Sequence, residues 1–137
     1  MKIKRYILSL IILLCAMSIQ ATTPQSGVHI FGFATSFTDS TVYITEIQYL
    51  DSAYIEKHHF LLGREQYSYQ LQNYLSTKGI KIHPTCVTFF AQEKDQIEKK
   101  YLTLRKKYEK AGKFIIKVIP LKDFIYHPIP LQAENNM

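Results

Sequence analysis

Cysteine, glycine and proline are scarce in this chain of 137 residues, which holds two cysteines, five glycines and five prolines. Such low glycine and proline contents exclude a collagen-like chain, and 47% hydrophobic residues exclude a disordered one. A domain typically closes one core with about 100 to 150 residues. The composition therefore predicts one packed globular domain.

The longest apolar run, Tyr6 to Ile19, is shorter than the roughly 20 residues that a membrane-spanning helix needs. It follows Lys2, Lys4 and Arg5 and precedes Gln20 and Ala21. Basic residues, a short apolar run and a small closing residue are typical of a secretory signal peptide. We predict a signal peptide over residues 1–21, with export to the periplasm or the exterior and no transmembrane anchor after cleavage. An uncleaved anchor is the alternative.

Removal of this leader changes the charge of the chain. Three of the 17 Lys and Arg residues and none of the 11 Asp and Glu residues lie in it, so the net charge falls from +6 to +3. Charge is also uneven in what remains. The segment from Glu93 to Lys113 carries eight basic and four acidic residues, and the rest of the mature chain is slightly acidic.

No intramolecular disulfide can form in the mature chain, because Cys15 lies in the leader and only Cys86 remains. Cys86 opens a run to Ala91 that is rich in strand-forming residues. A lone thiol in an oxidising compartment survives best when it is buried. We therefore interpret Cys86 as a core residue.

Hydrophobic periodicity predicts the first three elements. Residues 28–37 and 41–49 are rich in β-branched and aromatic residues and flank a short turn, which indicates a β-hairpin, and residues 51–55 continue or bend its second strand. A stripe of Tyr67, Leu71, Tyr74 and Leu75 then predicts a helix over 64–77. We expect Gly63 at its N-cap and Gly79 in the left-handed conformation at its C-terminal end.

The second half of the chain predicts a strand over 86–91, a helix over 93–111 that ends at Gly112, and a strand over 114–119. Residues 124–126 are expected to add a short edge element. The domain is expected to span 22–127, followed by a flexible tail over 128–137.

The order β-β-α-β-α-β predicts an α+β fold with two layers. We expect a four-stranded mixed sheet, with parallel strands around the second helix and both helices on one face. The other face would then be covered only by side chains such as Phe31, Phe33, Tyr43 and Ile47. An exposed patch of this kind usually marks an interaction site.

The sequence also resembles a protein family. The runs that carry the resemblance are Phe31 to Thr45, Gln66 to Leu71 and the lysine-rich helix over 93–111. Together they resemble an uncharacterised family of small exported proteins from anaerobic Gram-negative bacteria. The resemblance implies export and assigns no activity, cofactor or catalytic residue.

Candidates for catalysis are few. His83 lies three residues before Cys86, and an imidazole beside a thiol can activate a nucleophile or bind a metal. Along a strand this spacing places the two side chains on opposite faces, and Pro84 disturbs regular geometry. We therefore predict no catalytic residue, no metal ligand and no cofactor, and keep a small thiol-dependent or hydrolytic enzyme using Cys86 and His83 as the alternative.

The lysine-rich helix carries the main functional hypothesis. Five lysines lie away from its apolar stripe: Lys99, Lys100, Lys106, Lys107 and Lys110. Such a face binds acidic surfaces by charge neutralisation, whereas interspersed glutamates favour an ordinary solvated face. We expect an exported binding or scaffolding protein whose partner is an envelope protein or an acidic surface polymer. Export makes nucleic acid the least expected partner.

The leader predicts a defined mature N-terminus. Because a signal peptidase accepts the small residue Ala21, the exported chain should begin near Thr22. Intact-mass spectrometry of the exported protein measures this directly. Recovery of the full-length chain from the membrane fraction would contradict cleavage.

Overall fold

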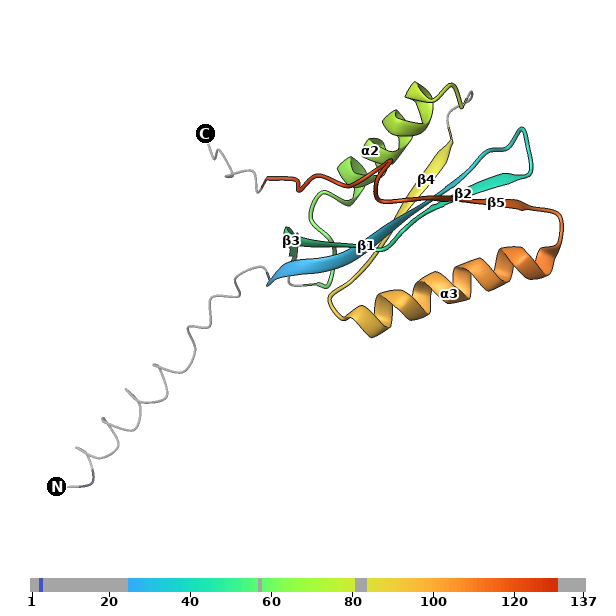
Figure 1. Cartoon of the computed structure of the whole chain (residues 1–137). Helices are drawn as coiled ribbons and strands as arrows, with labels where there is room; N and C mark the ends of the chain where they lie inside the picture. The colour runs from blue at the N-terminus through green and yellow to red at the C-terminus, as the bar shows by residue number, and fades with distance from the viewer. Residues whose placement is uncertain (1–2, 4–24, 57, 81–83, 131–137) are drawn as a thin grey trace.

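The structure, a computed structural model, describes residues 3, 25–56, 58–80 and 84–130. Most of the predicted signal peptide, His83 and residues 131–137 lie outside this part of the chain. A mixed sheet packs with two helices, which confirms the α+β class (Figure 1). The elements are β1 (Gln25–Thr35), β2 (Thr41–Thr45), β3 (Gln48–Ile55), α2 (Arg64–Thr77), β4 (Thr85–Ala91), α3 (Lys94–Ala111) and β5 (Ile115–Ile119).

β1 is the central strand of the sheet. On one side it pairs antiparallel with β2 and β3, and on the other it pairs antiparallel with β4. β5 pairs parallel with β2, so β4 and β5 are edge strands that run in the same direction. The expected parallel direction of the strands around α3 is confirmed, with β1 and β2 lying between them.

The sheet has five strands, where the sequence predicted four. The expected second strand is broken after Thr45, where Glu46 donates its backbone N–H to the Ile119 carbonyl of β5 at 3.1 Å. The Gly32 N–H is instead accepted by the Thr45 hydroxyl at 2.8 Å. Pairing with β1 resumes at Gln48 as β3.

The two helices cover opposite faces of the sheet, so the expected placement on one face is wrong (Figure 1). Tyr67, Leu71 and Leu75 of α2 share one core cluster with alternate residues of β1, among them Ile30. Ile97 of α3 belongs to a second cluster on the other face of the sheet. The fold therefore has three layers.

The sequence of β1 explains this arrangement. Val28, Ile30 and Ala34 point to α2, while Phe31 and Phe33 point to α3. A strand that is apolar at both alternating sets of positions is typical of burial on both faces. The stripe on each helix shows which side of the helix is buried and does not show against which face of the sheet.

The helix ends follow the glycines of the sequence. α2 spans the predicted range, and Gly79 just beyond it has a φ of +73°, as expected for a left-handed C-terminal residue. α3 begins one residue later than predicted and is capped by Gly112 at φ 70°. Gly63 is the N-cap of α2, with φ 74° and no capping side chain.

Residues 120–130 cross the α2 side of the sheet without forming a strand. Two glutamine amides hold this segment by pairing with its backbone. Gln48 of β3 bonds both N–H and C=O of Tyr126 at 2.7 and 2.9 Å. Gln70 of α2 does the same to His127 at 2.8 and 2.9 Å. Ile129, in the expected tail, donates its N–H to the Tyr67 hydroxyl at 3.1 Å.

Gly32 allows this segment to approach the sheet. A Cβ at Gly32 would collide with the Tyr126 hydroxyl and would lie 2.7 Å from Cδ2 of Leu71. The Tyr126 hydroxyl itself is buried and has no hydrogen-bond partner among the described residues. A residue without a side chain is therefore needed at position 32.

We expect Gly32→Ala to lower the free energy of unfolding by about 1–3 kcal/mol, the usual cost of overpacking a core. Tyr126→Phe alone should not lower it and should raise it slightly, because a buried hydroxyl without a hydrogen-bond partner costs free energy in the folded state. In the double variant the Tyr126→Phe change should raise it by more than it does alone and so restore part of the loss. Urea denaturation of the four proteins measures all three effects, and strictly additive effects would contradict the contact.

Candidate functional site

The predicted aromatic patch is covered. Phe31 is 0% exposed and Phe33 is 6% exposed. Phe31 contacts Tyr101 of α3 edge to face, with ring centroids 5.2 Å apart, and Phe33 lies 4.9 Å from the ring of Tyr108. Tyr43 is half-buried and packs against the cluster on the α2 side. The expected exposure of Phe31 and Phe33 is wrong, because α3 lies over them.

The predicted basic face is exposed but divided. Lys99, Lys100 and Lys107 line a groove between α3 and the edge of β4. Lys106 and Lys110 are exposed and do not line this groove. The structure thus brings only part of the predicted set together.

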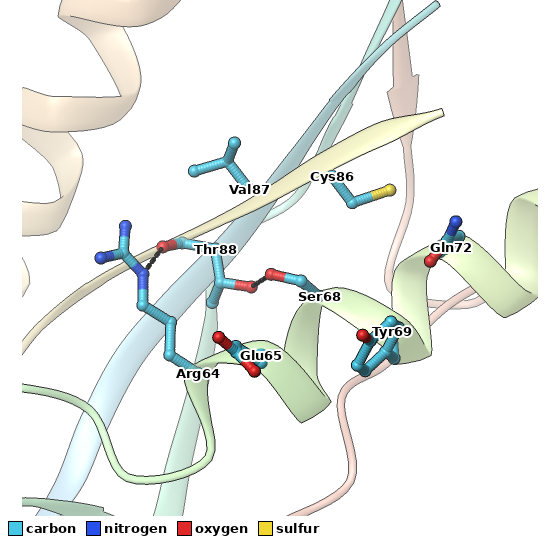
Figure 2. A pocket seen from close by; sticks show the side chains of 8 residues that line it. All are labelled: Arg64, Glu65, Ser68, Tyr69, Gln72, Cys86, Val87 and Thr88. Carbon is cyan, nitrogen blue, oxygen red and sulfur yellow. Dashed lines mark hydrogen bonds between the residues drawn. The ribbon is translucent and has the colours of Figure 1, made fainter. Parts of the chain in front are cut away.

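The floor of the groove includes the free edge of β4. The Thr88 carbonyl accepts a hydrogen bond from Nε of Arg64 at 3.1 Å (Figure 2). The Phe90 carbonyl accepts one from Nζ of Lys100 at 3.0 Å. Both carbonyls are on the side of β4 that is turned away from β1. No strand pairs with them there, because β4 has no second neighbouring strand. Cations over exposed backbone groups are a common way to stop another strand from pairing with an edge.

Two cations converge on Phe90. The guanidinium of Arg64 lies 5.5 Å from the centre of the Phe90 ring, and Nζ of Lys100 lies 5.6 Å from it. Arg64 is the first residue of α2, whereas Lys100 belongs to α3, so they come from opposite faces of the sheet. Each is held by a carbonyl and by the ring, within the range of cation–π attraction.

The groove formed in this way has a volume of about 870 Å³. This falls within the range of about 300–1,000 Å³ that is usual for small-molecule sites. Its wall combines cations with an apolar floor. The lining residues are Arg64, Phe89, Phe90, Gln96, Lys99, Lys100, Thr103, Leu104 and Lys107.

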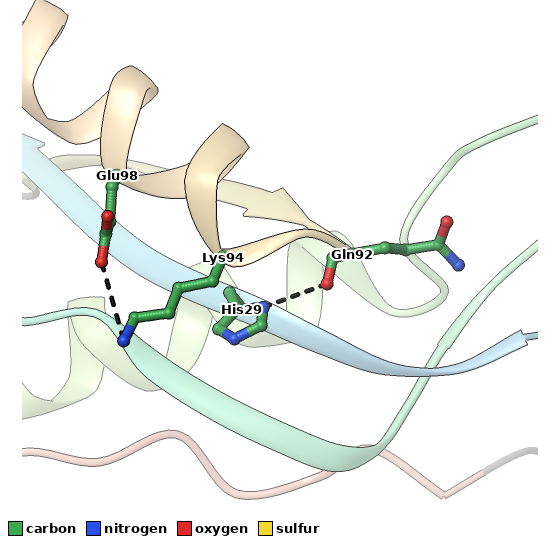
Figure 3. Close-up of polar contacts among 4 residues, drawn as sticks. All are labelled: His29, Gln92, Lys94 and Glu98. Carbon is green, nitrogen blue, oxygen red and sulfur yellow. Dashed lines mark hydrogen bonds and ion pairs between the residues drawn. The ribbon is translucent and has the colours of Figure 1, made fainter.

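No carboxylate lines the groove. Over the described ranges, the ion pairs are Lys94 with Glu98 at 4.0 Å and Arg105 with Glu109 at 3.0 Å. Both lie within one helical face and outside the groove lining; Figure 3 shows the first beside His29, whose ring bonds the Gln92 carbonyl. The glutamates of α3 therefore leave the groove lysines unpaired.

A second, smaller pocket lies on the α2 side of the β4 edge and shares Arg64 with the groove. It has a volume of about 360 Å³, and its lining includes Ser68, Cys86 and Thr88 (Figure 2). The Ser68 and Thr88 hydroxyls bond each other at 2.7 Å. Among the described residues, no histidine, carboxylate or amine is hydrogen-bonded to either hydroxyl.

Cys86 has the properties of a structural thiol. It is half-buried, and its Sγ lies 3.7 Å from the Pro84 carbonyl as a weak donor. Burial raises the pKa of the Cys86 thiol to about 11, whereas a reactive cysteine needs a lowered pKa. His83, its proposed partner, lies outside the described residues. The enzyme alternative gains no support from this geometry.

Within the part of the chain that the structure describes, no three His, Cys, Asp or Glu side chains gather as metal ligands. No helix there has both the length and the apolar character needed to cross a membrane. Comparison with protein families, curated proteins and solved structures finds no match to this chain.

The sequence reasoning missed Arg64, Phe89, Phe90 and Leu104 as site residues. Phe89 and Phe90 follow one another in a predicted strand, but their place at an edge depends on the strand order. Arg64 opens α2 and meets α3 only because the two helices lie on either side of β4. No local sequence pattern indicates that Arg64 lies close to α3.

The raised pKa predicts slow labelling of Cys86. At pH 7 iodoacetamide should react at least about 100-fold more slowly with the native protein than with the chain unfolded in urea, because a free thiol has a pKa of about 8.5. The native rate should rise about tenfold per pH unit between pH 7 and 9. Mass spectrometry follows the reaction, with Cys86→Ala as the unlabelled control. Rapid native labelling at pH 7 would instead support the thiol enzyme.

Proposed function

We propose that the mature chain is an exported binding protein that holds an acidic component of the cell envelope in the basic groove, the groove lined by Arg64, Lys99, Lys100 and Lys107. One observation carries the proposal. Four cations from two helices line one groove, and no carboxylate lines it. An acidic surface polymer or an acidic segment of an envelope protein fits this charge.

Electrostatics support the proposal. Arg64, Lys99, Lys100 and Lys107 line the same groove, and like charges gathered in one place repel each other. A bound anion relieves this repulsion. Because the groove is open, salt should screen the attraction beyond about 8 Å at physiological ionic strength.

Export and the partner's location rest on the N-terminal sequence. Lys2, Lys4 and Arg5, followed by the apolar run, predict secretion, and the resemblance to small exported proteins agrees with it. In the periplasm or outside the cell, acidic polysaccharides, anionic lipids and acidic proteins are the available anions. Nucleic acid remains the least expected.

The groove lysines should govern binding. Lys99→Glu with Lys107→Glu should weaken binding to heparin at least ~30-fold, because each basic residue near an anionic surface contributes about 1 kcal/mol. Lys106→Glu with Lys110→Glu is the matched control, since it changes the net charge equally outside the groove. Heparin affinity and its salt dependence are measured for the three proteins, with thermal melting to verify that each is folded.

The outcomes separate the groove from general charge. Retention of binding by the control and its loss in the groove variant would support the proposal. Equal loss in both variants would indicate that only the overall charge of α3 matters, and salt-insensitive binding by all three would contradict an electrostatic site.

A further inference from the structure

The guanidinium of Arg64 is fixed and yet has unused donors. Its Nε–H bonds the Thr88 carbonyl at 3.1 Å, and its Cζ lies 5.5 Å from the centre of the Phe90 ring. A guanidinium carries five N–H donors in one plane, four of them on the terminal nitrogens. No other residue that the structure describes accepts a hydrogen bond from them. Arg64 is therefore a preorganised fork whose free edge matches two oxygens of a carboxylate or phosphate.

Lys100 is the second cation beside Phe90 that can contact the same carboxylate or phosphate. It is held by the same residue, because its Nζ bonds the Phe90 carbonyl at 3.0 Å and lies 5.6 Å from the ring. An ammonium has three donors, so two remain after this bond. The two cations that flank Phe90 thus present free donors to the same groove from α2 and α3.

The rest of the groove is suited to an apolar group. Among its lining residues, Phe89 and Leu104 pack with the cluster on the α3 side of the sheet, whereas Phe90 packs with the cluster on the α2 side. Phe89 stacks on the buried Phe31, with ring centroids 4.9 Å apart and planes 10° apart, so it is held in place. A polymer with only charged and hydroxyl groups would leave this floor unused, whereas an alkyl chain would remove it from water.

We propose that the groove binds a single-chain amphiphilic oxyanion as a monomer, with its carboxylate or phosphate on Arg64 and Lys100 beside Phe90 and its chain along Phe89 and Leu104. This inference rests on the basic groove of the proposed function, and it takes a free amphiphile as the acidic ligand in place of a polymer or a protein segment. The ligand is a free molecule and not a bilayer, because the chains of a lipid in a membrane are turned away from its head-group surface and cannot reach the apolar floor.

Chain length tests the apolar part. Binding of inorganic phosphate, hexyl phosphate and octyl phosphate is measured by calorimetry below the concentration at which micelles form, with octyl glucoside as the neutral amphiphile. A fully buried methylene raises a binding constant roughly fourfold, so half-burial of the two extra methylenes should make octyl phosphate bind roughly fourfold tighter than hexyl phosphate. Octyl glucoside should bind at least about tenfold more weakly than octyl phosphate.

Arg64→Lys tests the head-group position without changing the net charge. It removes the planar fork and should weaken octyl phosphate binding about tenfold while heparin binding changes little. Arg105→Lys is the matched control, because Arg105 lies on α3 outside the groove and pairs with Glu109. Leu104→Gln should reduce the gain from hexyl to octyl phosphate, and Leu102→Gln, at an exposed site outside the groove, should not.

Several results would overturn the inference. Equal affinities for the three phosphates would remove the apolar part and leave the basic groove as a site for anions alone. Equal binding of octyl glucoside and octyl phosphate, or an unchanged affinity in Arg64→Lys, would remove the head-group position. Binding to phosphatidylglycerol vesicles without binding of monomers would indicate a membrane surface instead. Failure of every phosphate and of heparin would overturn the proposed function as well.

Discussion

Burial of β1 on both faces and along both edges is the constraint on which the rest of the structure depends. Its alternating side chains, Ile30 and Ala34 on one side and Phe31 and Phe33 on the other, require a cover on each face. α2 and α3 supply these covers, and β4 then closes one side of β1 as an edge strand. An edge flanked by helices from opposite faces is what brings Arg64 and Lys100 to a common position.

The cations at this edge have two physical effects at once. They cover the Thr88 and Phe90 carbonyls, which would otherwise be open to pairing by another chain. They also leave a net positive charge that no carboxylate of the groove lining balances. Because Arg64 uses only Nε for the carbonyl, it can keep the edge covered while its terminal nitrogens contact an anion. Edge protection and anion binding are thus compatible in one side chain.

The sequence predicts local elements well where a stripe and a glycine agree. The stripe from Tyr67 to Leu75 and the glycines that flank it gave α2 its bounds, and Gly112 gave the end of α3. Helix placement failed because a stripe carries no information about the sheet face that it meets. The apolar pattern of β1 held that information, since Phe31 and Ile30 are adjacent and cannot share a face.

The candidate site was also predicted only in part, because local sequence patterns mark its lysines and do not mark the residues that the fold brings to them. Lys99, Lys100 and Lys107 could be found from charge along one helix, which is a local property. Arg64, Phe90 and Leu104 could not, because they become neighbours only when β4 is an edge between two helices. Strand order is a long-range property that single-residue patterns do not encode.

The hydrogen bonds from the Gln48 and Gln70 amides to the backbone of residues 126 and 127 also affect the order in which the protein can fold. Whether the chain leaves a ribosome or a secretion channel, it does so from its N-terminus, so β1 appears early and Tyr126, which packs over Gly32, appears after both helices. Until then, the Gln48 and Gln70 amides lack their backbone partners, and the core between α2 and the sheet stays open to water. Completion of the fold is therefore tied to the emergence of residues 120–130, and a nascent chain that stops short of them exposes apolar surface to chaperones and proteases.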